Sequence, residues 1–531
     1  MSSAAGKKLL AIPGPIELSP TVQHTLGLPP LSHVGPEFVK IFREAIGMTR
    51  WAHSFSTLDL PPSFAWRLRS NRKPEAQVVR TSHAGSQAFI LAGSGTLGWD
   101  QVGANLIEKG DNALVLHTGY FGDGFRDCLQ TYGAKVDVVH SPLGGTVRIE
   151  DVKRALRNKQ YKLVTITHVD TSTSVLSDAQ AISECVRRVS PNTLIVLDAV
   201  CSLASEDVRT DDWGLDIVLS ASQKGLGAPP GLSILVASSR AIGVWEERER
   251  RGVKSGSYYS SWEKWLPIMR AYDQGKPAYF GTPAVNLLRA YHASLLEITQ
   301  GQISLDERLA LHKQASGRVK AAAERLGMVQ VAKETKGRAH GMTALYVPPG
   351  SGLMAADVLP LVGKRGVVMA GGLVAEIKER YIRVGRYGLE CLVEEGVVVM
   401  VEVVEEGVGV EEEVEERTGA AGEEDGNDPG SGRGRLVLVL IIRCSLQLLW
   451  QWKRRLLLLD LTLSSSPNLN RFPNFLDHLR LPLVFGKQLD ALSATNCPER
   501  LAPVAFALAL SCHALLRQPR PLHPRRHRPR P

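Results

Sequence analysis

Short apolar runs alternate with amphipathic segments along the first half of the chain. The runs at residues 194–197 and 217–219 have the length and the Ile/Val content of buried parallel strands. A further apolar run at 113–116 precedes a turn, and the segment 178–189 has the spacing of a crossover helix. This alternation predicts an α/β fold with a mainly parallel sheet and helices on both faces.

The regions on either side of this pattern predict the domain organisation. Residues 1–35 form an arm interrupted by Pro and Gly, and a helix that starts at Pro36 opens a large domain over residues 36–300. Residues 301–388 predict a smaller C-terminal α/β domain. Its elements, in chain order, are a helix at 311–326, a strand at 343–347 and a helix at 355–362.

Two stretches interrupt this organisation. Residues 51–83 lack a sustained period and contain several prolines and a basic cluster, so we interpret them as an insertion, either a surface loop or the translation of an unremoved intron. Residues 389–531 begin with a Val/Glu/Gly run and continue without a coherent period, as a wrong reading frame or a retained intron would. We expect this tail to be disordered or unrelated to the preceding domains.

Each of the two central apolar runs is followed by one charged residue. Asp198 ends the first run and Lys224 lies in the turn after the second. Ligands of open α/β sheets bind outside the carboxyl ends of the strands, so both side chains are expected at one site. A partly desolvated lysine is a nucleophile toward aldehydes, and a carboxylate keeps a pyridine nitrogen protonated. The pair therefore predicts imine chemistry with pyridoxal phosphate.

The segment LDIVLSASQKGLGAPPGLS around Lys224 resembles the lysine signature of class V aminotransferases. Within that family the closest resemblance is to alanine–glyoxylate and serine–pyruvate aminotransferases. The resemblance implies the aspartate aminotransferase-like fold, known as fold type I, with a large domain and a smaller C-terminal domain. It also implies that Lys224 binds pyridoxal 5'-phosphate and that Asp198 stabilises the protonated ring nitrogen.

Further motifs resemble those that contact the cofactor in this family. In GSQAFILAGSGT, a strand ends before a helix, and small residues there let backbone amides approach a phosphate. The resemblance assigns the phosphate contact to Gly95 and Thr96 and the aromatic contact with the ring to Phe121, where tryptophan is usual; Tyr120 is the alternative. The remaining cofactor contacts that it implies are Thr171, Val200 and Gln223.

The same resemblance implies a substrate site and a second subunit. Arg383, in the strand-like YIRVG, matches the arginine that binds the substrate carboxylate, and Arg386 is the alternative. In AYFGTPAVN, Tyr279 and Thr282 match contacts that come from the neighbouring subunit, so a homodimer is expected. His168 is not expected to be a general base, because the freed lysine carries the proton in aminotransferases.

The predicted function is ping-pong transfer of an amino group from alanine, or from serine, to glyoxylate, which forms glycine and removes glyoxylate. The substrates are thus small amino acids and keto acids. Two alternatives stay open: an inactive or misfolded variant, because of the insertion and the replaced C-terminus, and a class V lyase. A desulfurase would need a catalytic cysteine on a mobile loop, and no cysteine here has that setting.

Composition limits the partners and the compartment. The net charge of +9 does not predict a nucleic-acid partner, because much of the basic excess lies in the Arg/Pro/His-rich residues 517–531. Seven cysteines without CxxC spacing indicate a reducing compartment and predict no metal site. The apolar run at 436–442 is too short to span a bilayer, and the final Pro-Arg-Pro is no peroxisomal tripeptide. We expect an intracellular, soluble protein in the peroxisome, mitochondrion or cytosol.

Overall fold

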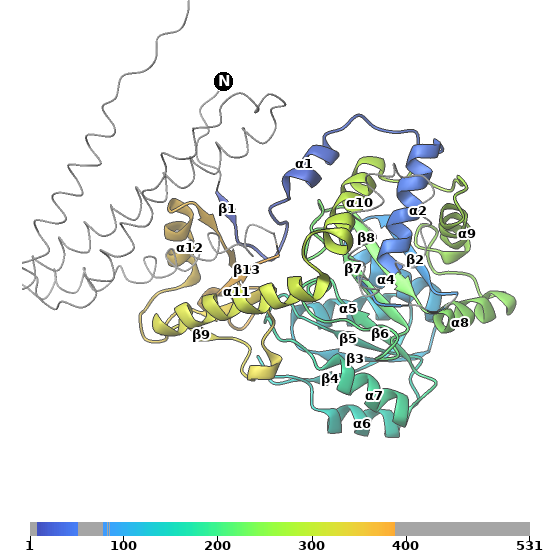
Figure 1. Ribbon diagram of the computed structural model, residues 1–531. Coiled ribbons are helices and arrows are strands. Elements are labelled where there is room, and N and C mark those ends of the chain that lie inside the picture. The colour runs from blue at the N-terminus through green and yellow to red at the C-terminus, as the bar shows by residue number, and fades with distance from the viewer. Residues whose placement is uncertain (1–7, 51–77, 82, 84, 388–531) are drawn as a thin grey trace, which may run out of the picture. The chain divides into compact units, whose positions relative to one another are not determined.

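The computed structural model describes residues 8–50, 78–81, 83 and 85–387, which all belong to one compact unit, Met1–Ala421 (Figure 1). The predicted tail at 389–531 and most of the predicted insertion at 51–83 lie outside the described residues. The last part of that insertion does not behave as a surface loop. Val78 and Val79 are buried in the main hydrophobic core, and the Thr210 hydroxyl donates to the Val79 carbonyl at 2.5 Å.

A seven-stranded sheet in the order β2-β8-β7-β6-β5-β3-β4 forms the centre of the larger part. Its strands are β2 (Gln87–Ala92), β3 (Asn112–His117), β4 (Lys135–His140), β5 (Leu163–Thr167), β6 (Leu194–Asp198), β7 (Ile217–Ala221) and β8 (Leu232–Ala237). Within this sheet only β8 runs in the direction opposite to the other six strands. Strands β5, β6 and β7 are buried along their whole length, as expected for strands covered on both faces.

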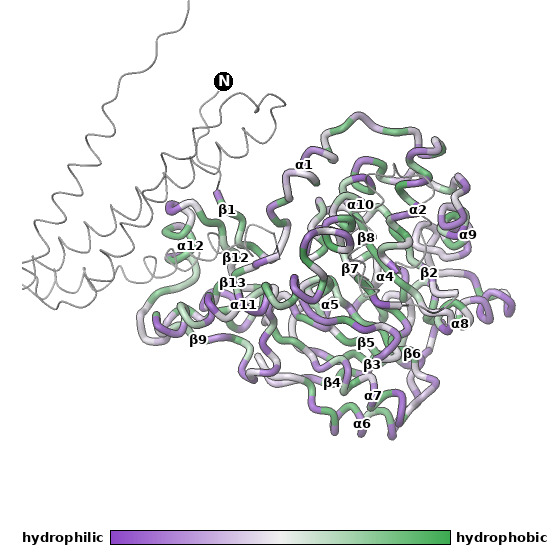
Figure 2. The backbone as a smooth tube through the Cα atoms, viewed as in Figure 1, coloured by the Kyte–Doolittle hydropathy of each residue, from purple (hydrophilic) through white to green (hydrophobic). Residues whose placement is uncertain are grey.

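Helices pack on the two faces of this sheet, and Figure 2 shows that hydrophilic and hydrophobic residues are mixed along these helices. They are α2 (Pro36–Arg50), α4 (Thr96–Leu106), α5 (Tyr120–Thr131), α6 (Ile149–Asn158), α7 (Ala179–Val189), α8 (Ser239–Arg250), α9 (Trp262–Asp273) and α10 (Val285–Gln300). The crossover helix predicted at 178–189 is α7. It begins after Asp178, whose carboxylate accepts the Ala181 amide at 2.9 Å.

A second sheet, antiparallel and in the order β12-β13-β10-β9, forms the smaller part. Its elements are α11 (Leu305–Arg325), β9 (Val329–Gln330), η2 (Thr335–Gly337), β10 (Met342–Tyr346), α12 (Ala355–Lys364), β12 (Ala370–Gly371), η3 (Lys378–Arg380) and β13 (Tyr381–Gly385). The predicted start of the first helix at residue 311 is wrong. Helix α11 begins at Leu305 because Ser304 and Glu307 form a capping box, which satisfies amides of its first turn.

The N-terminal arm is attached to the smaller sheet and then crosses to the larger part. Strand β1 (Leu9–Leu10) pairs in parallel with β11 (Val367–Val368). The Ala11 carbonyl accepts the Gly385 amide of β13 at 2.8 Å. Further along, helix α1 (Pro20–Leu26), capped by Ser19, packs against α10. The arm therefore contacts both the smaller and the larger part of the chain.

The close approach of the arm to β13 predicts the effect of a small substitution. A Cβ atom at Gly385 would lie 2.1 Å from the Ile12 carbonyl oxygen, so Gly385→Ala has to displace the arm. We expect a loss of about 1–3 kcal/mol in the free energy of unfolding, measured by urea denaturation. The matched control is Gly243→Ala in α8, where a Cβ meets no atom within 4 Å. Equal stability of both variants would contradict this close packing.

Candidate active site

Five turns that carry predicted site residues lie at one edge of the large sheet. The strands that precede them all point in the same direction, so their carboxyl ends meet there. The turns follow β2 (Gly95 and Thr96), β3 (Phe121), β5 (Thr171), β6 (Asp198 and Val200) and β7 (Gln223 and Lys224). The structure thus brings together eight of the predicted residues, which are distributed over residues 95–224 of the chain.

Lys224 lies under the N-terminal arm. Its Nζ atom donates a hydrogen bond to the Pro13 carbonyl. At Gly14, with φ of +128°, a Cβ atom would lie 3.1 Å from Lys224 Cδ and 3.2 Å from Nζ, so this close crossing favours glycine. Burial lowers the pKa of the Lys224 amine, and the Arg383 charge acts in the same direction, while Asp198 opposes it. The neutral, nucleophilic form of the amine is therefore favoured.

Asp198 ends β6 with a buried side chain that is 4% exposed. Its Oδ2 accepts the Trp99 indole N–H at 2.8 Å, and its Oδ1 accepts the Val200 amide at 3.0 Å. Burial raises the pKa of Asp198 to about 6, although both hydrogen bonds oppose this rise. Each carboxylate oxygen has a further lone pair, so Asp198 can accept another proton donor.

The turn before α4 is tightly packed against the end of β7. A Cβ atom at Gly95 would lie 2.9 Å from Val200 Cγ2 and 3.3 Å from Ala221 Cβ. No side chain caps the start of α4, where the Thr96 hydroxyl lies 2.6 Å from the Ser94 hydroxyl. Uncapped amides and two hydroxyls at a helix N-terminus suit an anionic group.

Phe121, Thr171 and Gln223 lie around the same edge. Phe121 is half-buried on the first turn of α5, whereas its neighbour Tyr120 is 54% exposed. Thr171 is buried, and its carbonyl accepts a hydrogen bond from Arg383 Nη1 at 3.2 Å. The buried Oε1 of Gln223 has no hydrogen-bond partner within the described part of the chain.

The two candidate arginines have different environments. Arg383 in β13 donates through Nε to the Gly371 carbonyl at 2.7 Å, and its charge influences the pKa of Lys224. Arg386 is fully buried, and its Nη2 donates to the Thr343 hydroxyl at 2.8 Å and to the His340 carbonyl at 3.0 Å. Arg386 therefore joins elements of the smaller part, and Arg383 lies closer to the strand ends.

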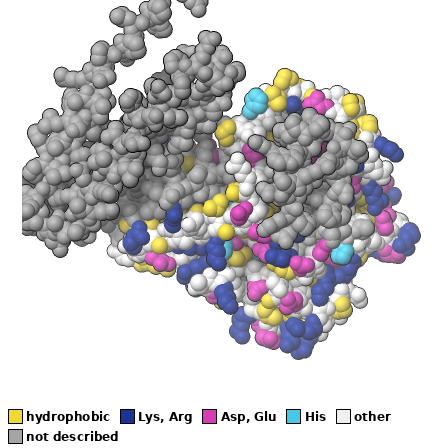
Figure 3. Space-filling model, viewed as in Figure 1, with side chains coloured by type: hydrophobic (Ala, Val, Ile, Leu, Met, Phe, Trp, Pro, Cys, Tyr) yellow, Lys and Arg dark blue, Asp and Glu magenta, His cyan; other side chains and the backbone are white. Residues whose placement is uncertain are grey.

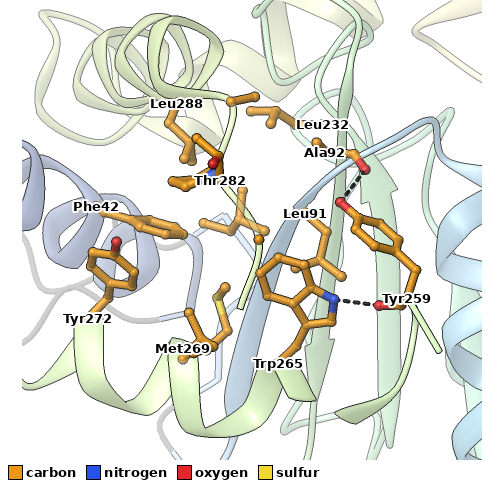
Figure 4. Close-up of a pocket in the computed structure, with 15 residues that line it drawn as sticks. Phe42, Leu91, Ala92, Leu232, Tyr259, Trp265, Met269, Tyr272, Thr282 and Leu288 are labelled. Carbon is orange, nitrogen blue, oxygen red and sulfur yellow. Dashed lines mark hydrogen bonds between the residues drawn. The ribbon is translucent and has the colours of Figure 1, made fainter. Parts of the chain in front are cut away.

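Tyr279 and Thr282 are not brought to Lys224 in this single chain. Tyr279 is 63% exposed, and its hydroxyl lies 3.4 Å from the Thr282 hydroxyl. Thr282 instead lines an apolar pocket between α2, β2 and α9 (Figure 4). In this pocket the Tyr259 hydroxyl donates to the Ala92 carbonyl at 3.4 Å, one residue before the turn that leads into α4. Asp198 and Lys224 are not part of its lining.

His168 has the environment of a structural residue. Its Nδ1 atom lies 2.9 Å from the Ser202 hydroxyl, and burial lowers the pKa of the imidazole to about 4. Trp99 and Pro13, in contrast, contact the central pair and were not among the predicted site residues. In the sequence, Trp99 is indistinguishable from an ordinary core residue of an apolar helix. Nothing in the sequence of the arm indicates that Pro13 contacts Lys224.

The charge of the surface, the arrangement of potential metal ligands and the hydropathy of the helices are further features of the described residues. Figure 3 shows Lys and Arg side chains interspersed with Asp and Glu over the described part of this face. Among the described residues no group of three or more His, Cys, Asp or Glu side chains is placed to hold a metal ion. Helices in the described part of the chain are too short or too polar to cross a membrane.

Comparison with known families and sequences finds clear similarities. The family model described as aminotransferase class-V matches residues 71–387. Alanine–glyoxylate aminotransferase 1 of Saccharomyces cerevisiae is 41% identical over 388 residues, which cover 72% of this chain and 92% of the yeast protein. Serine–glyoxylate aminotransferase of Hyphomicrobium methylovorum is 29% identical over 347 residues, which cover 64% of this chain and 76% of the relative.

Solved structures agree with the architecture. The crystal structure of an alanine–glyoxylate aminotransferase from Nostoc sp. superposes with a TM-score of 0.65 at 26% identity and covers 77% of this chain and 97% of its own. The crystal structure of an aspartate aminotransferase from Thermus thermophilus gives a TM-score of 0.62 at 28% identity, covering 75% and 99%. The predicted α/β fold class is thereby confirmed.

The raised pKa of Asp198 predicts a pH-dependent stability. An acid whose pKa is higher in the folded than in the unfolded state stabilises the fold while protonated, and this contribution is lost as the pH rises through the folded pKa. Here the window runs from the unfolded pKa of about 4 to the folded pKa of about 6. Without added cofactor, the unfolding free energy of the wild type relative to Asp198→Asn should therefore fall by roughly 2–3 kcal/mol between pH 4 and pH 7.

Urea denaturation at several pH values measures this difference. The variant Asp212→Asn, which alters a carboxylate that is 69% exposed, controls for the loss of a surface charge. A wild-type minus Asp198→Asn difference that stays constant over the window would show that Asp198 is not protonated within it.

Proposed function

Because the chain belongs to the class V aminotransferases, which are pyridoxal-phosphate-dependent enzymes, we propose that it transfers an amino group from alanine or serine to glyoxylate. The strongest support is the placement of Lys224 and Asp198 at adjacent strand ends, with burial favouring a neutral amine. The family likeness and the close yeast relative give the reaction class.

The residues at the strand ends fit pyridoxal phosphate. Lys224 offers an amine of lowered pKa, and Asp198 offers a carboxylate with free lone pairs at the end of β6. Gly95 and Thr96 provide the uncapped helix start that suits the phosphate. Gln223 and Thr171 add buried polar groups, Val200 packs against Gly95 and Phe121 offers an aromatic face. Within the described part of the chain, Gln223 Oε1 is a buried acceptor that has no hydrogen-bond partner.

Each residue has a separable task in the proposed reaction. When bound, pyridoxal phosphate supplies an aldehyde that receives and returns the amino group and a ring that withdraws electrons from the substrate's α-carbon. Lys224 Nζ would remove the proton from that α-carbon. Asp198 would keep the ring nitrogen protonated, and a protonated ring withdraws electrons more strongly than a neutral one.

Arg383 is the proposed contact for the substrate carboxylate. Its Nε and Nη1 atoms donate to the carbonyls of Gly371 and Thr171, which fixes the guanidinium plane. Its Nη2 atom has no hydrogen bond within the described residues, so the guanidinium retains donors for an anion. A planar arginine held in this way suits a carboxylate better than a lysine would.

The choice of substrates rests on the relatives. The yeast relative is named for alanine and glyoxylate, and the Hyphomicrobium relative for serine and glyoxylate. Glyoxylate is therefore the proposed acceptor, and alanine the first donor to test.

We also propose the predicted domain boundaries, with a large domain over 36–300 and a small domain over 301–388.

A homodimer completes the proposed site. Tyr279 and Thr282 are exposed, and the pocket that Thr282 lines does not include Lys224, so both residues are available to contact the phosphate site of a second copy, as the family motif implies. Exposed aromatic residues at Tyr258 and Tyr259, beside Phe280, form an apolar surface next to them. Burial of such a surface between two copies favours association.

An absorption spectrum tests the proposed reaction directly. Purified protein is mixed with pyridoxal phosphate, then with alanine, then with glyoxylate. We expect a visible band that requires Lys224, disappears with alanine and returns with glyoxylate, because the amino group moves onto the cofactor and off again. Serine in place of alanine compares the two donors.

The matched control is Lys224→Ala, which retains the other predicted contacts and should give no such band. A wild-type protein without the band would instead support the inactive variant of the family. A band that forms with cofactor but does not respond to alanine or serine would exclude both proposed donors.

Hybrid dimers test the contribution of the second subunit. Lys224→Ala chains are co-expressed with Tyr279→Ala/Thr282→Ala chains, and the heterodimer is isolated by two tags. One of its two sites combines an intact Lys224 with the intact Tyr279 and Thr282 of the other chain. We expect about half of the wild-type activity, although both homodimers are nearly inactive. No recovery in the heterodimer would place all contacts within one chain.

A further inference from the structure

Trp99 lies on the first turns of α4, directly after the predicted phosphate turn. Its side chain is 7% exposed. The indole N–H donates to Asp198 Oδ2 at 2.8 Å, and the two residues lie 99 positions apart in the chain. A tryptophan N–H is a donor only, so this bond favours an acceptor that carries a lone pair and negative charge.

Neighbouring aromatic rings hold the indole in this orientation. Phe125 stacks on Trp99 with ring centroids 5.2 Å apart and an interplanar angle of 14°. Phe121 contacts it edge-on at 6.4 Å and 69°. Both phenylalanines belong to α5, so this helix supports the indole. A donor that is held by such packing can direct its partner with little loss of conformational entropy.

We propose that Trp99 is a positioning residue, which fixes the orientation of the Asp198 carboxylate and holds it in its ionised form for the cofactor's ring nitrogen. This inference rests on the proposed function, since it assigns Asp198 to that nitrogen. Trp99 itself does not contact the reacting atoms in this assignment. It acts through Asp198.

The electrostatic surroundings of Asp198 explain why such a donor is needed. Burial and the nearby carboxylate of Asp170 raise its pKa, whereas the Val200 amide, the Trp99 indole and the Lys224 amine lower it. The balance leaves the pKa at about 6, close to neutral pH. Removal of one stabilising N–H would move the carboxylate toward its protonated form at neutral pH.

Trp99 also connects three predicted cofactor contacts. It follows Gly95 and Thr96 on the same helix, contacts Phe121 edge-on and donates to Asp198. A change at this indole is therefore transmitted to the ring-nitrogen partner and to the aromatic contact together. Trp245, another buried tryptophan, has no comparable bond, because its Nε1 has no hydrogen-bond partner among the described residues.

The first experiment monitors the Trp99–Asp198 hydrogen bond directly and does not depend on enzyme activity. Protein labelled with ¹⁵N at the indole nitrogen is titrated from pH 5 to pH 8 without cofactor, and its indole N–H signals are followed by NMR. Loss of one signal in Trp99→Phe assigns that residue. We expect the Trp99 signal to shift with a midpoint near pH 6, and the shift to disappear in Asp198→Asn.

The second experiment measures the dissociation constant of pyridoxal phosphate by equilibrium dialysis at several pH values. Trp99→Phe should weaken binding about tenfold at neutral pH and move the pH midpoint of binding upward by about one unit, as loss of a charge-assisted hydrogen bond predicts. Trp245→Phe removes the same ring volume without removing a bond to a carboxylate, and should stay within about twofold of the wild type.

The outcomes separate this inference from the proposed function. A Trp99 signal that does not titrate, or that titrates equally in Asp198→Asn, overturns the positioning role. Equal loss of affinity in Trp99→Phe at every pH would show a purely structural contribution and overturns it as well. Failure of the wild type to bind the cofactor, together with a normal Trp99 titration, would instead contradict the proposed function and leave the hydrogen bond established.

Discussion

Burial of one acid and one base at the same edge of a sheet is the constraint on which the rest of the site depends. An unpaired buried charge costs on the order of several kcal/mol, so Asp198 and Lys224 both require partners. Asp198 has the Trp99 indole and the Val200 amide, and Lys224 has the Pro13 carbonyl. These partners come from three separate elements, which are thereby held around the same point.

The direction of the strands determines which residues share this point. Because β2, β3, β5, β6 and β7 run the same way, the turns after them meet, while the turn after the antiparallel β8 lies at the opposite edge. Burial favours the uncharged form of both groups, because it lowers the pKa of Lys224 and raises the pKa of Asp198. The hydrogen bonds to Asp198 limit this effect and keep an ionised carboxylate within reach near neutral pH.

Local sequence signals were sufficient for the central parallel strands, the position of Asp198 and Lys224 after them and the strand that carries Arg383, but not for β4 or for β8 with its reversed direction. An apolar run followed by a charged residue places Asp198 and Lys224 without knowledge of any distant contact. The Trp99–Asp198 and Lys224–Pro13 pairs were not predictable in this way, because each joins residues 99 and 211 positions apart. The start of α11 was missed for a different reason: the capping box at Ser304 and Glu307 lies outside the hydrophobic period. Tyr279 and Thr282 need a second chain to be assessed.

The crossing of the arm over Lys224 has a consequence for how the amine becomes available. Since Nζ is bonded to the Pro13 carbonyl, any aldehyde that approaches must compete with the chain's own backbone for this nitrogen. The same arm is anchored through β1 to β11 and through Ala11 to Gly385. The backbone segment that occupies the amine is thus held by the smaller part of the chain, so residues far from the strand ends help to define the surroundings of Lys224.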